Sequence, residues 1–500
     1  MPIKKVSALT SRPLVKVEGG LLAGLKEDKV FKFYGIPYAA PPVGKWRWRA
    51  PQPLAPWAGI KKSDIYGPMA YQIGGSRLPE TERKLVESED CLYLNIWTPS
   101  ALEGEKLPVM VWIHGGGFMN GSGALTLYDG TKLARQGVVL VTFNYRLGPL
   151  GNMVHPELEA ESENGSSGNY GFLDQIAVLE WLQKNISGFG GDPDNVTIFG
   201  QSAGAMSVAL LCTSPRAEGL FQKAICQSGG LLMVPREIPY EEARRQGLEM
   251  EKALRVTGIK EMRRITAGKL IASARSLMAA DEMPKKLRFA PVIDGVNIRS
   301  QDKTLRERAR IPLIIGSNKD EATFFKTGMP PITTNYYQKV IKSYFGHKAA
   351  SVLAAFPVGT DEEAEKQFMN LHTCNLFTIP ISAMAGKLSG LGGNVYVYRF
   401  NRSAPRNQAS GIGASHGEEI PYIFGHTHEP GYTEEDNKIS VAMMKYWVQF
   451  GRTGNPNAAG WPVWPEYTPE SDKYLSFGDE VAVKDYADDE SLKALSLLLA

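Results

Sequence analysis

The sequence predicts an α/β fold, with a large, mostly parallel central sheet flanked by helices and with long loop insertions. Runs of apolar and β-branched residues recur along the chain without polar alternation, which is typical of strands buried on both faces. Segments with helical spacing alternate with these runs, and this alternation favours parallel strands joined by helices. A hydrophobic content of 43% and a charged content of 22% are those of an ordinary globular protein.

The expected strands are spread over most of the chain, and several of them end at glycine or proline, which terminate regular structure. They cover residues 31–37, 92–97, 107–114, 138–143, 196–199, 311–316 and 395–400. Helices are expected over residues 174–185, 205–211 and 443–450. Residues 492–500 form a short amphipathic segment, which we expect to pack on the body of the protein as a helix.

Length and charge limit the possible organisation and partners. A chain of 500 residues exceeds the size at which one core usually stops growing, so two domains would be the ordinary expectation. However, no linker, repeat or low-complexity tract divides the sequence, and we expect a single catalytic domain over residues 1–500. The net charge of +3 gives no reason to expect nucleic acid as a partner. No apolar stretch approaches the length that spans a membrane.

Cysteines and the N-terminal residues bear on compartment and cofactors. The four cysteines are widely spaced and form no metal-ligand pairs, so we expect isolated core thiols, no metal and no cofactor. Residues 1–7 lack the apolar core of a signal peptide. A cytoplasmic location is therefore expected, with secretion or a periplasmic location after removal of a signal as the alternative. We expect a monomer or a weak homo-oligomer.

A serine bracketed by glycines carries the strongest chemical signal. Ser202 follows the apolar run 196–199, Gly200 and Gly204 flank it, and a helix-like run begins directly afterwards. A serine on a tight turn from strand to helix is the nucleophile elbow of α/β-hydrolases. The glycines are needed because strand and helix crowd the turn, and the serine backbone itself is strained there.

A second Gly-x-Ser-x-Gly match surrounds Ser415 at residues 413–417. It follows a loop rich in glycine and serine rather than an apolar strand, and no run of small apolar residues follows it. Since the bare pattern occurs readily by chance in a glycine-rich chain, context decides between the two matches. We therefore predict Ser202 as the nucleophile.

The nucleophile needs a base, and in α/β-hydrolases the chain order is serine, acid, histidine. His416 lies late in the chain, in a glycine-rich loop after the expected strand 395–400, where a base can reach the carboxyl edge of the sheet. The other histidines precede the serine, lie in helix-like stretches, or form an H-x-H pair that makes only a weak metal site; they are His114, His155, His347, His372, His426 and His428.

An acid is expected in a loop that follows a buried strand, between the serine and the histidine. Asp320 and Glu321 both satisfy this condition after the expected strand 311–316. Asp294 is a third candidate, although its setting before glycine is typical of a turn. The pattern of residues alone leaves Asp320 and Glu321 open.

The tetrahedral intermediate of acyl transfer carries an oxyanion, which needs preorganised hydrogen-bond donors. The run Gly115, Gly116 and Gly117 follows His114 at the end of an expected strand. This is the H-G-G-G type of loop whose backbone N–H groups bind an oxyanion, together with the N–H of the residue after the nucleophile, Ala203.

The chain resembles the type-B carboxylesterase family, which includes cholinesterases, bacterial p-nitrobenzyl esterases and fungal lipases. Residues 89–97 and 189–204 carry the resemblance, and supporting segments lie at residues 34–44, 144–148, 227–229, 414–422 and 454–457. It implies a cofactor-free serine hydrolase that acts on small-molecule carboxylic esters through an acyl-enzyme. It also implies Glu321 as the acid, with Asp320 structural, and agrees on Ser202 and His416.

Three departures from the family pattern are informative. Many members have Glu before the nucleophile, where this chain has Gln201; a carboxylate there would favour the imidazolium form of the histidine. Cys91 matches a disulfide cysteine of the family, but its usual partner position holds Ala70, so the first loop is not stapled. Residues 79–90 contain no aromatic residue to bind a quaternary ammonium, which makes a choline ester an unfavourable substrate.

Two other functions compete with ester hydrolysis in solution. A non-catalytic adhesion or scaffold protein of the same fold would not need Ser202, Glu321 and His416, yet all three are present. A lipase that acts at a lipid interface needs a lid with a large apolar face, whereas the 66–90 loop is polar. We therefore expect small to medium-sized, fairly apolar soluble esters as substrates.

Overall fold

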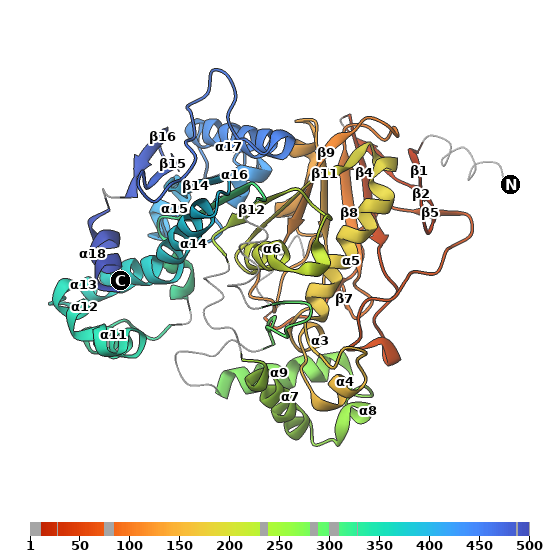
Figure 1. Cartoon of the computed structure of the whole chain (residues 1–500), viewed down its shortest axis with the longest axis horizontal. Coiled ribbons are helices and arrows are strands. Elements are labelled where there is room, and N and C mark those ends of the chain that lie inside the picture. The colour runs from red at the N-terminus through yellow and green to blue at the C-terminus, as the bar shows by residue number, and fades with distance from the viewer. Residues whose placement is uncertain are drawn as a thin grey trace. The chain divides into compact units, whose positions relative to one another are not determined.

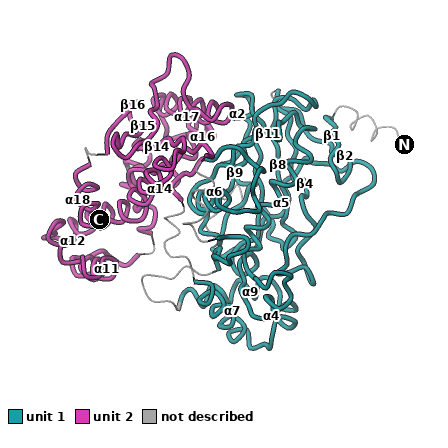
Figure 2. The backbone as a smooth tube through the Cα atoms, in the orientation of Figure 1, with its two compact units in different colours: residues 1–224, 235–308 teal, residues 225–234, 309–500 magenta. Residues whose placement is uncertain are grey.

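The computed structural model describes residues 12–27, 29–74, 85–230, 239–280, 289–299, 310–327, 329–486 and 489–499. The chain forms two compact units (Figure 2). The first comprises residues 1–224 and 235–308, and the second comprises residues 225–234 and 309–500. Residues 1–7 and most of the polar part of the 66–90 loop, on which two of the expectations above depend, lie outside the described residues.

The first unit contains a long run of hydrogen-bonded strands, in the order β11-β9-β10-β8-β4-β3. Strand β9 pairs in parallel with β10 and β11, whereas β8, β4 and β3 continue the sheet with antiparallel pairing. The strands are β3 (Leu25–Glu27), β4 (Val30–Pro37), β8 (Tyr93–Thr98), β9 (Leu107–Ile113), β10 (Val139–Phe143) and β11 (Gly191–Gln201). In the β11–β9 register, Gly200 lies opposite Ile113, two residues before the expected nucleophile.

Short strands and several helices complete the first unit (Figure 1). Small sheets pair β1 (Leu14–Val17), β2 (Gly20–Ala23) and β5 (Ile60–Lys62), and pair β6 (Met69–Ala70) with β7 (Glu87–Ser88). The helices are α2 (Thr131–Ala134), α3 (Gly148–Gly151), α4 (Pro156–Ala160), α5 (Tyr170–Asn185), α6 (Ala203–Thr213), α7 (Tyr240–Leu254), α8 (Gly258–Met262) and α9 (Ala267–Ala280). Single 3₁₀ turns lie at Gly44–Trp46, Thr126–Tyr128, Ile186–Phe189 and Pro215–Ala217.

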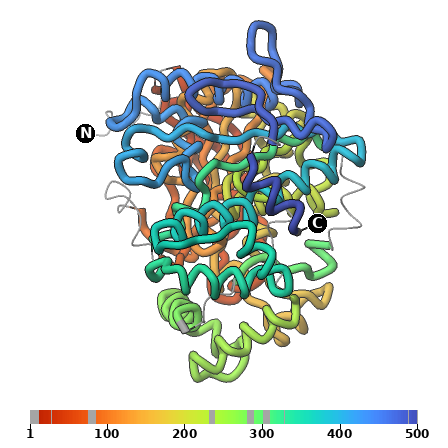
Figure 3. The backbone as a smooth tube through the Cα atoms, turned by 90° about the vertical axis from the view of Figure 1, so that its left-hand side faces the viewer, coloured from red at the N-terminus to blue at the C-terminus, as the bar shows by residue number. Residues whose placement is uncertain are grey.

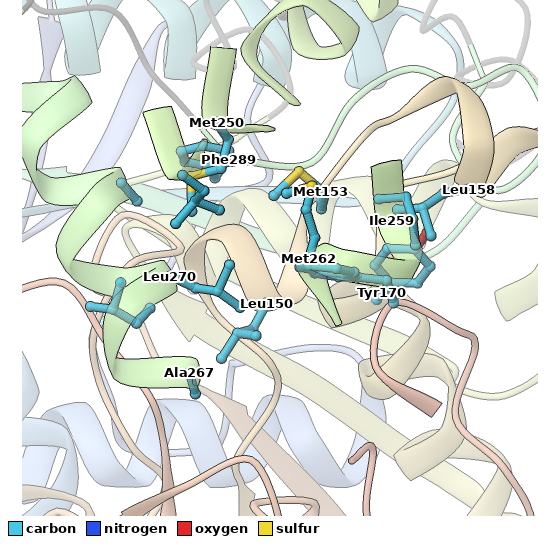
Figure 4. Close-up of a cluster of buried hydrophobic side chains, with 14 of the residues drawn as sticks. Leu150, Met153, Leu158, Tyr170, Met250, Ile259, Met262, Ala267, Leu270 and Phe289 are labelled. Atoms are coloured by element: carbon cyan, nitrogen blue, oxygen red, sulfur yellow. The ribbon is translucent and has the colours of Figure 1, made fainter. Parts of the chain in front are cut away.

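Helices α3, α4, α7, α8 and α9 share one apolar cluster (Figure 4). Met153, Met250, Met262 and Leu270 are completely buried in it, and Met119 packs against it from the segment after β9. Burying a side chain of this size contributes about 1.5–3 kcal/mol relative to leaving it exposed. The cluster thereby fixes this helical layer to the rest of the first unit.

The second unit has its own strip of sheet, in the order β13-β14-β15-β16, with parallel pairing except between the last two strands. The strands are β13 (Leu313–Asn318), β14 (Val395–Phe400), β15 (Lys473–Phe477) and β16 (Val481–Asp485). Strand β12 (Lys223–Gln227) begins in the first unit and ends in the second. Because β10–β8, β8–β4, β4–β3 and β15–β16 pair antiparallel, the sheet is more mixed than the sequence predicts.

Helices of the second unit are α11 (Thr334–Phe345), α12 (Ala349–Ala355), α13 (Asp361–Thr373), α14 (Ile379–Gly390), α15 (Pro405–Ser410), α16 (Ile420–Phe424), α17 (Glu434–Thr453) and α18 (Glu490–Leu499). A π-helical turn, η10 (Cys374–Thr378), joins α13 to α14, and 3₁₀ turns η8 (Glu321–Lys326) and η9 (Gly346–Lys348) complete the unit. Helix α11 lies beside both α12 and α13 (Figure 3). No helix in the described part of the chain is long and apolar enough to cross a bilayer.

Candidate active site

Ser202 stands on the sharp turn between β11 and α6, as the sequence predicts. Its backbone angles of φ 58° and ψ −126° are rare for an L-residue, and such strain costs about 1–3 kcal/mol. Only glycine fits on either side of it: a Cβ on Gly204 would lie 2.0 Å from the carbonyl oxygen of Ile113, and one on Gly200 would lie 2.7 Å from the same atom. The turn is therefore in direct backbone contact with β9, while Ser202 keeps part of its surface exposed.

The glycine run after β9 lies against this turn. A Cβ on Gly115 would lie 3.1 Å from the Cβ of Ser202. Gly116 and Gly117 have φ values of 107° and 63°, which favour glycine. The loop turns back on itself, since the N–H of Asn120 donates to the Gly116 carbonyl oxygen at 3.1 Å.

Ala203 is the first residue of α6, and the first N–H groups of a helix have no intrahelical acceptor. This end of a helix also favours negative charge. The glycine loop and the start of α6 thus both adjoin Ser202 within the first unit, an arrangement that suits an oxyanion hole.

His114 has a structural setting between β9 and the glycine loop. Its Nδ1 lies 2.9 Å from the Gly115 carbonyl oxygen, and its ring stacks on Tyr145 at 4.4 Å. The Tyr145 hydroxyl donates to the His114 carbonyl oxygen at 2.8 Å. Burial lowers the pKa of His114 to about 4, so the ring is neutral at neutral pH.

His416 and Glu321 meet in the second unit. The Nδ1 of His416 lies 2.5 Å from Oε2 of Glu321, and the carboxylate is completely buried. The other oxygen of Glu321 accepts the backbone N–H of Asn318 at 2.7 Å. A buried carboxylate that accepts from Nδ1 fixes the ring orientation and the tautomer in which Nε2 carries the lone pair.

Asp320, the neighbouring candidate acid, faces the backbone instead. Its Oδ2 accepts the N–H of Ala414 at 2.9 Å, and its own N–H donates to the Ala414 carbonyl oxygen at 2.9 Å. Asp320 therefore ties the end of β13 to the loop that carries His416. Ser415, the serine of the second Gly-x-Ser-x-Gly match, lies in this loop and has neither a strand before it nor a helix directly after it.

Three phenylalanine rings surround the imidazole of His416. Phe324 and Phe325 of η8 lie 5.7 and 5.2 Å from it between ring centroids, and Phe377 of the π-helical turn lies 5.2 Å away. Phe324 is 49% exposed and Phe325 is 37% exposed, whereas Phe377 is buried. The histidine thus has an apolar surround with accessible aromatic surface beside it.

The remaining histidines lie elsewhere and make contacts unrelated to the Glu321–His416 pair. His155 accepts the Glu157 N–H at Nδ1, and its Nε2 lies 3.0 Å from Glu251. The ring of His372 stacks on Phe368, and His347 lies in the turn η9. In the H-x-H pair, Nδ1 of His426 lies 3.5 Å from Glu429, and Nδ1 of His428 lies 3.2 Å from the Gly425 carbonyl oxygen. Throughout the described residues, no cluster of three or more His, Cys, Asp or Glu side chains could hold a metal.

Sequence reasoning missed a buried polar group behind His416. Glu419 is completely buried and accepts hydrogen bonds from Asn318 at 2.6 Å and from Gln227 at 3.2 Å. Burial, reinforced by the charge of Glu321, raises its pKa to about 7. Asn318 and Glu419 are far apart in the sequence, and the only available signal was the pair of acidic residues after His416.

Cys91, Cys226 and Cys374 are buried and Cys212 is partly exposed, and none of these four cysteines is in a disulfide. Cys91 and Ala70 line the same small cavity, so the family's disulfide position is occupied by a thiol and a methyl group. Burial raises the pKa of Cys91, which makes this thiol a poor nucleophile. For the first loop, the prediction of a core thiol without a disulfide is thus confirmed.

The strand-to-helix serine, the glycine loop and the buried acid–histidine pair define the class of the protein as an α/β-hydrolase. The chain belongs to the carboxylesterase family, whose family model matches residues 11–495. It is 38% identical to fumonisin B1 esterase of Sphingopyxis macrogoltabida, with 95% of this chain and 88% of that protein covered. It is 36% identical to para-nitrobenzyl esterase of Bacillus subtilis (strain 168), with 96% and 98% covered.

Solved structures agree with this assignment. A PNB esterase structure superposes with a TM-score of 0.83 at 33% identity, over 97% of this chain and 100% of that one. A thermophilic PNB esterase superposes with a TM-score of 0.85 at 34% identity, with the same coverage. The predicted fold class is therefore confirmed, and the protein is a serine carboxylic-ester hydrolase.

Proposed function

We propose that Ser202 is the nucleophile, His416 the general base and Glu321 the acid that orients the base. The observation that carries this proposal is the pair of local geometries: a strained serine beside a glycine loop in one unit, and a histidine held at Nδ1 by a buried carboxylate in the other. Asp320 has a structural role in this proposal, because its carboxylate accepts the N–H of Ala414.

The reaction follows from these assignments. Ser202 Oγ attacks the ester carbonyl carbon while its proton passes to Nε2 of His416. The N–H groups of Gly116, Gly117 and Ala203 bind the oxyanion of the tetrahedral intermediate. Collapse of the intermediate breaks the bond to the alcohol, which takes the proton from the imidazolium, and leaves an acyl-enzyme. Water then repeats the sequence and releases the acid.

The proposed substrates are small to medium-sized, fairly apolar carboxylic esters. The exposed rings of Phe324 and Phe325 beside His416 offer an apolar surface to a substrate. The names of two relatives, a para-nitrobenzyl esterase and a fumonisin B1 esterase, agree with carboxylic esters as substrates.

A direct test combines turnover with covalent labelling. The protein should hydrolyse p-nitrophenyl butyrate, and diethyl p-nitrophenyl phosphate should stop turnover by adding one diethylphosphoryl group to Ser202. Ser202→Ala should lose at least about 10³-fold in kcat and should take no label. Turnover that survives in Ser202→Ala, or a label on another residue, would overturn the assignment.

We infer a cytoplasmic location and a monomeric or weakly associating state, with no nucleic-acid partner. The buried thiols of Cys91 and Cys374, which are not in disulfides, support a reducing compartment. Cell fractionation of the natural host and light scattering of the purified protein test these inferences, and a predominantly secreted protein or a tight oligomer would contradict them.

A further inference from the structure

We propose that Glu419 is a positioning residue for His416, acting through Asn318. The proposal rests on the assignment of His416 as the general base. The reaction described above does not use the buried carboxyl group of Glu419. Glu419 has no exposed surface, and both of its oxygens accept hydrogen bonds from buried side-chain amides.

Asn318 is the link between this carboxyl group and the proposed catalytic pair. As the last residue of β13, it donates its backbone N–H to Glu321 Oε1 at 2.7 Å. Its side-chain Nδ2 donates to the Ser415 carbonyl oxygen at 2.6 Å, directly before His416, and to Glu419 Oε2 at 2.6 Å. One residue thus holds the acid, the backbone beside the base and the second carboxyl group.

The orientation of the Asn318 amide follows from its partners. The Ser415 carbonyl oxygen can only accept, so the Asn318 nitrogen must face it, and the second hydrogen of that nitrogen points to Glu419. A carboxylate oxygen is the acceptor that completes this arrangement, and removing it would leave a buried N–H without a partner.

Glu419 is itself held from the opposite side. Gln227, at the end of β12, donates Nε2 to Glu419 Oε1 at 3.2 Å, while its own Oε1 accepts the indole N–H of Trp447 at 3.2 Å. Gln227 and Trp447 are completely buried. A continuous chain of hydrogen bonds therefore runs from α17 through Gln227, Glu419 and Asn318 to the Glu321–His416 pair.

The two carboxyl groups also act on the charge of the base. Among the described residues, Glu321, His416 and Tyr398 are titratable groups that interact with Glu419, and the charges of Glu419 and Glu321 contribute to the raised pKa of Tyr398. Any negative charge on Glu419 stabilises the imidazolium that forms when His416 takes the serine proton. Glu419 therefore affects both the position of His416 and the pH below which His416 is protonated and can no longer act as a base.

The decisive experiment compares Glu419→Gln with Glu418→Gln. The control lies one residue earlier, and its carboxylate faces Asn407 and Arg406 instead. We expect Glu419→Gln to lower kcat for p-nitrophenyl butyrate about tenfold or more with little change in KM, since a carboxamide can accept from only one of the two amides that face it. The acid limb of its kcat/KM profile should move to lower pH, because a charge that favours imidazolium is gone.

A second variant tests the route through Asn318. Asn318→Ala keeps the backbone N–H to Glu321 but removes both side-chain bonds, and it should also lower kcat. If Glu419 acts through Asn318, the double variant should be no slower than the slower single variant. If Glu419→Gln folds poorly, as judged by its melting temperature and by titration of Ser202 with diethyl p-nitrophenyl phosphate, Asn318→Ala by itself tests the network, and an unchanged kcat in Asn318→Ala would overturn the proposal.

The outcomes separate this proposal from the catalytic assignment. A wild-type protein without esterase activity would refute the proposed catalytic residues. An active wild type together with a Glu419→Gln variant whose kcat and acid limb match Glu418→Gln would overturn the positioning role alone. Independent, multiplying effects of the two single variants would overturn the route through Asn318.

Discussion

At the residue scale, the position before the nucleophile should set the pH range of the reaction. Gln201 is buried at the end of β11, where many members of the family carry a glutamate. A carboxylate there would favour the imidazolium form of His416, so the base would be lost at a higher pH. We expect wild-type kcat/KM to persist to lower pH than that of Gln201→Glu. Profiles of both enzymes on p-nitrophenyl butyrate test this, and identical acid limbs would contradict it.

A second residue-scale prediction concerns stability rather than rate. The pKa of His114 is about 4 in the folded protein, compared with 6.5 when it is not perturbed. Between these values the unfolded chain binds a proton that the folded protein does not, so the contribution of His114 to stability is complete above pH 6.5 and falls as pH decreases toward 4. The loss is about 1.4 kcal/mol per pH unit.

His114→Asn removes this titration while keeping a donor near the Gly115 carbonyl oxygen. The variant is expected to be less stable at neutral pH because the ring no longer stacks on Tyr145. The informative quantity is the difference in melting temperature between wild type and variant, measured from pH 7.5 to pH 5. That difference should shrink on acidification, and a constant difference would show that His114 does not titrate in this way.

At the element scale, the turn between β11 and α6 depends on a backbone contact that tolerates no side chain. A Cβ on Gly204 would lie 2.0 Å from the Ile113 carbonyl oxygen. We expect Gly204→Ala to shift the serine away from the glycine loop, with a loss of more than about 10²-fold in kcat/KM, since misplacement by 1 Å can have that effect.

Gly268→Ala is the matched control, because this glycine lies in α9 with open space around it. Alanine is a better helix former, so the control should be as active as wild type and up to about 1 kcal/mol more stable. Esterase assays and thermal melts of both variants test the contrast. A fully active Gly204→Ala would contradict the crowding argument.

The elements also show how far the sequence could predict the fold. Strand β14 has the predicted bounds, while β13 begins at Leu313 rather than at residue 311 because Pro312 has no N–H to pair. Helix α17 begins at Glu434, well before the predicted residues 443–450. Its first turns are polar and give no hydrophobic periodicity, yet Thr433 and Asp436 form a capping box that could have revealed its start.

The site was predictable where its chemistry is local in sequence. The serine turn and the glycine loop are short contiguous motifs, and the structure places them as expected. The residue pattern could not decide whether Asp320 or Glu321 is the acid, because both are acidic and adjacent. The direction of the turn after β13 decides it: the Asp320 carboxylate accepts from the Ala414 N–H, and the Glu321 carboxylate contacts His416. Glu419 was missed because its partners come from separate strands.

At the scale of the whole molecule, the division into two units falls inside a strand. The boundary lies between Ala224 and Ile225 of β12, and both residues are completely buried. Domain boundaries normally lie in exposed linkers that few contacts cross. Strand β12 instead continues through the boundary, and its last residue, Gln227, holds Glu419 in the second unit. This continuity supports the prediction of a single domain over residues 1–500.

A single domain should unfold in one step. We expect one calorimetric transition, with an unfolding enthalpy of about 350 kcal/mol from the usual value per residue, and with equal calorimetric and van 't Hoff enthalpies. Two resolved transitions, or a calorimetric enthalpy near twice the van 't Hoff value at several scan rates, would contradict a single domain.

A chain restricted to residues 309–500 lacks Ile225–Gln227 of β12 and therefore the Gln227 amide that donates to Glu419. We expect this fragment to remain unfolded when measured by circular dichroism. An independently folded fragment would identify the second unit as a domain.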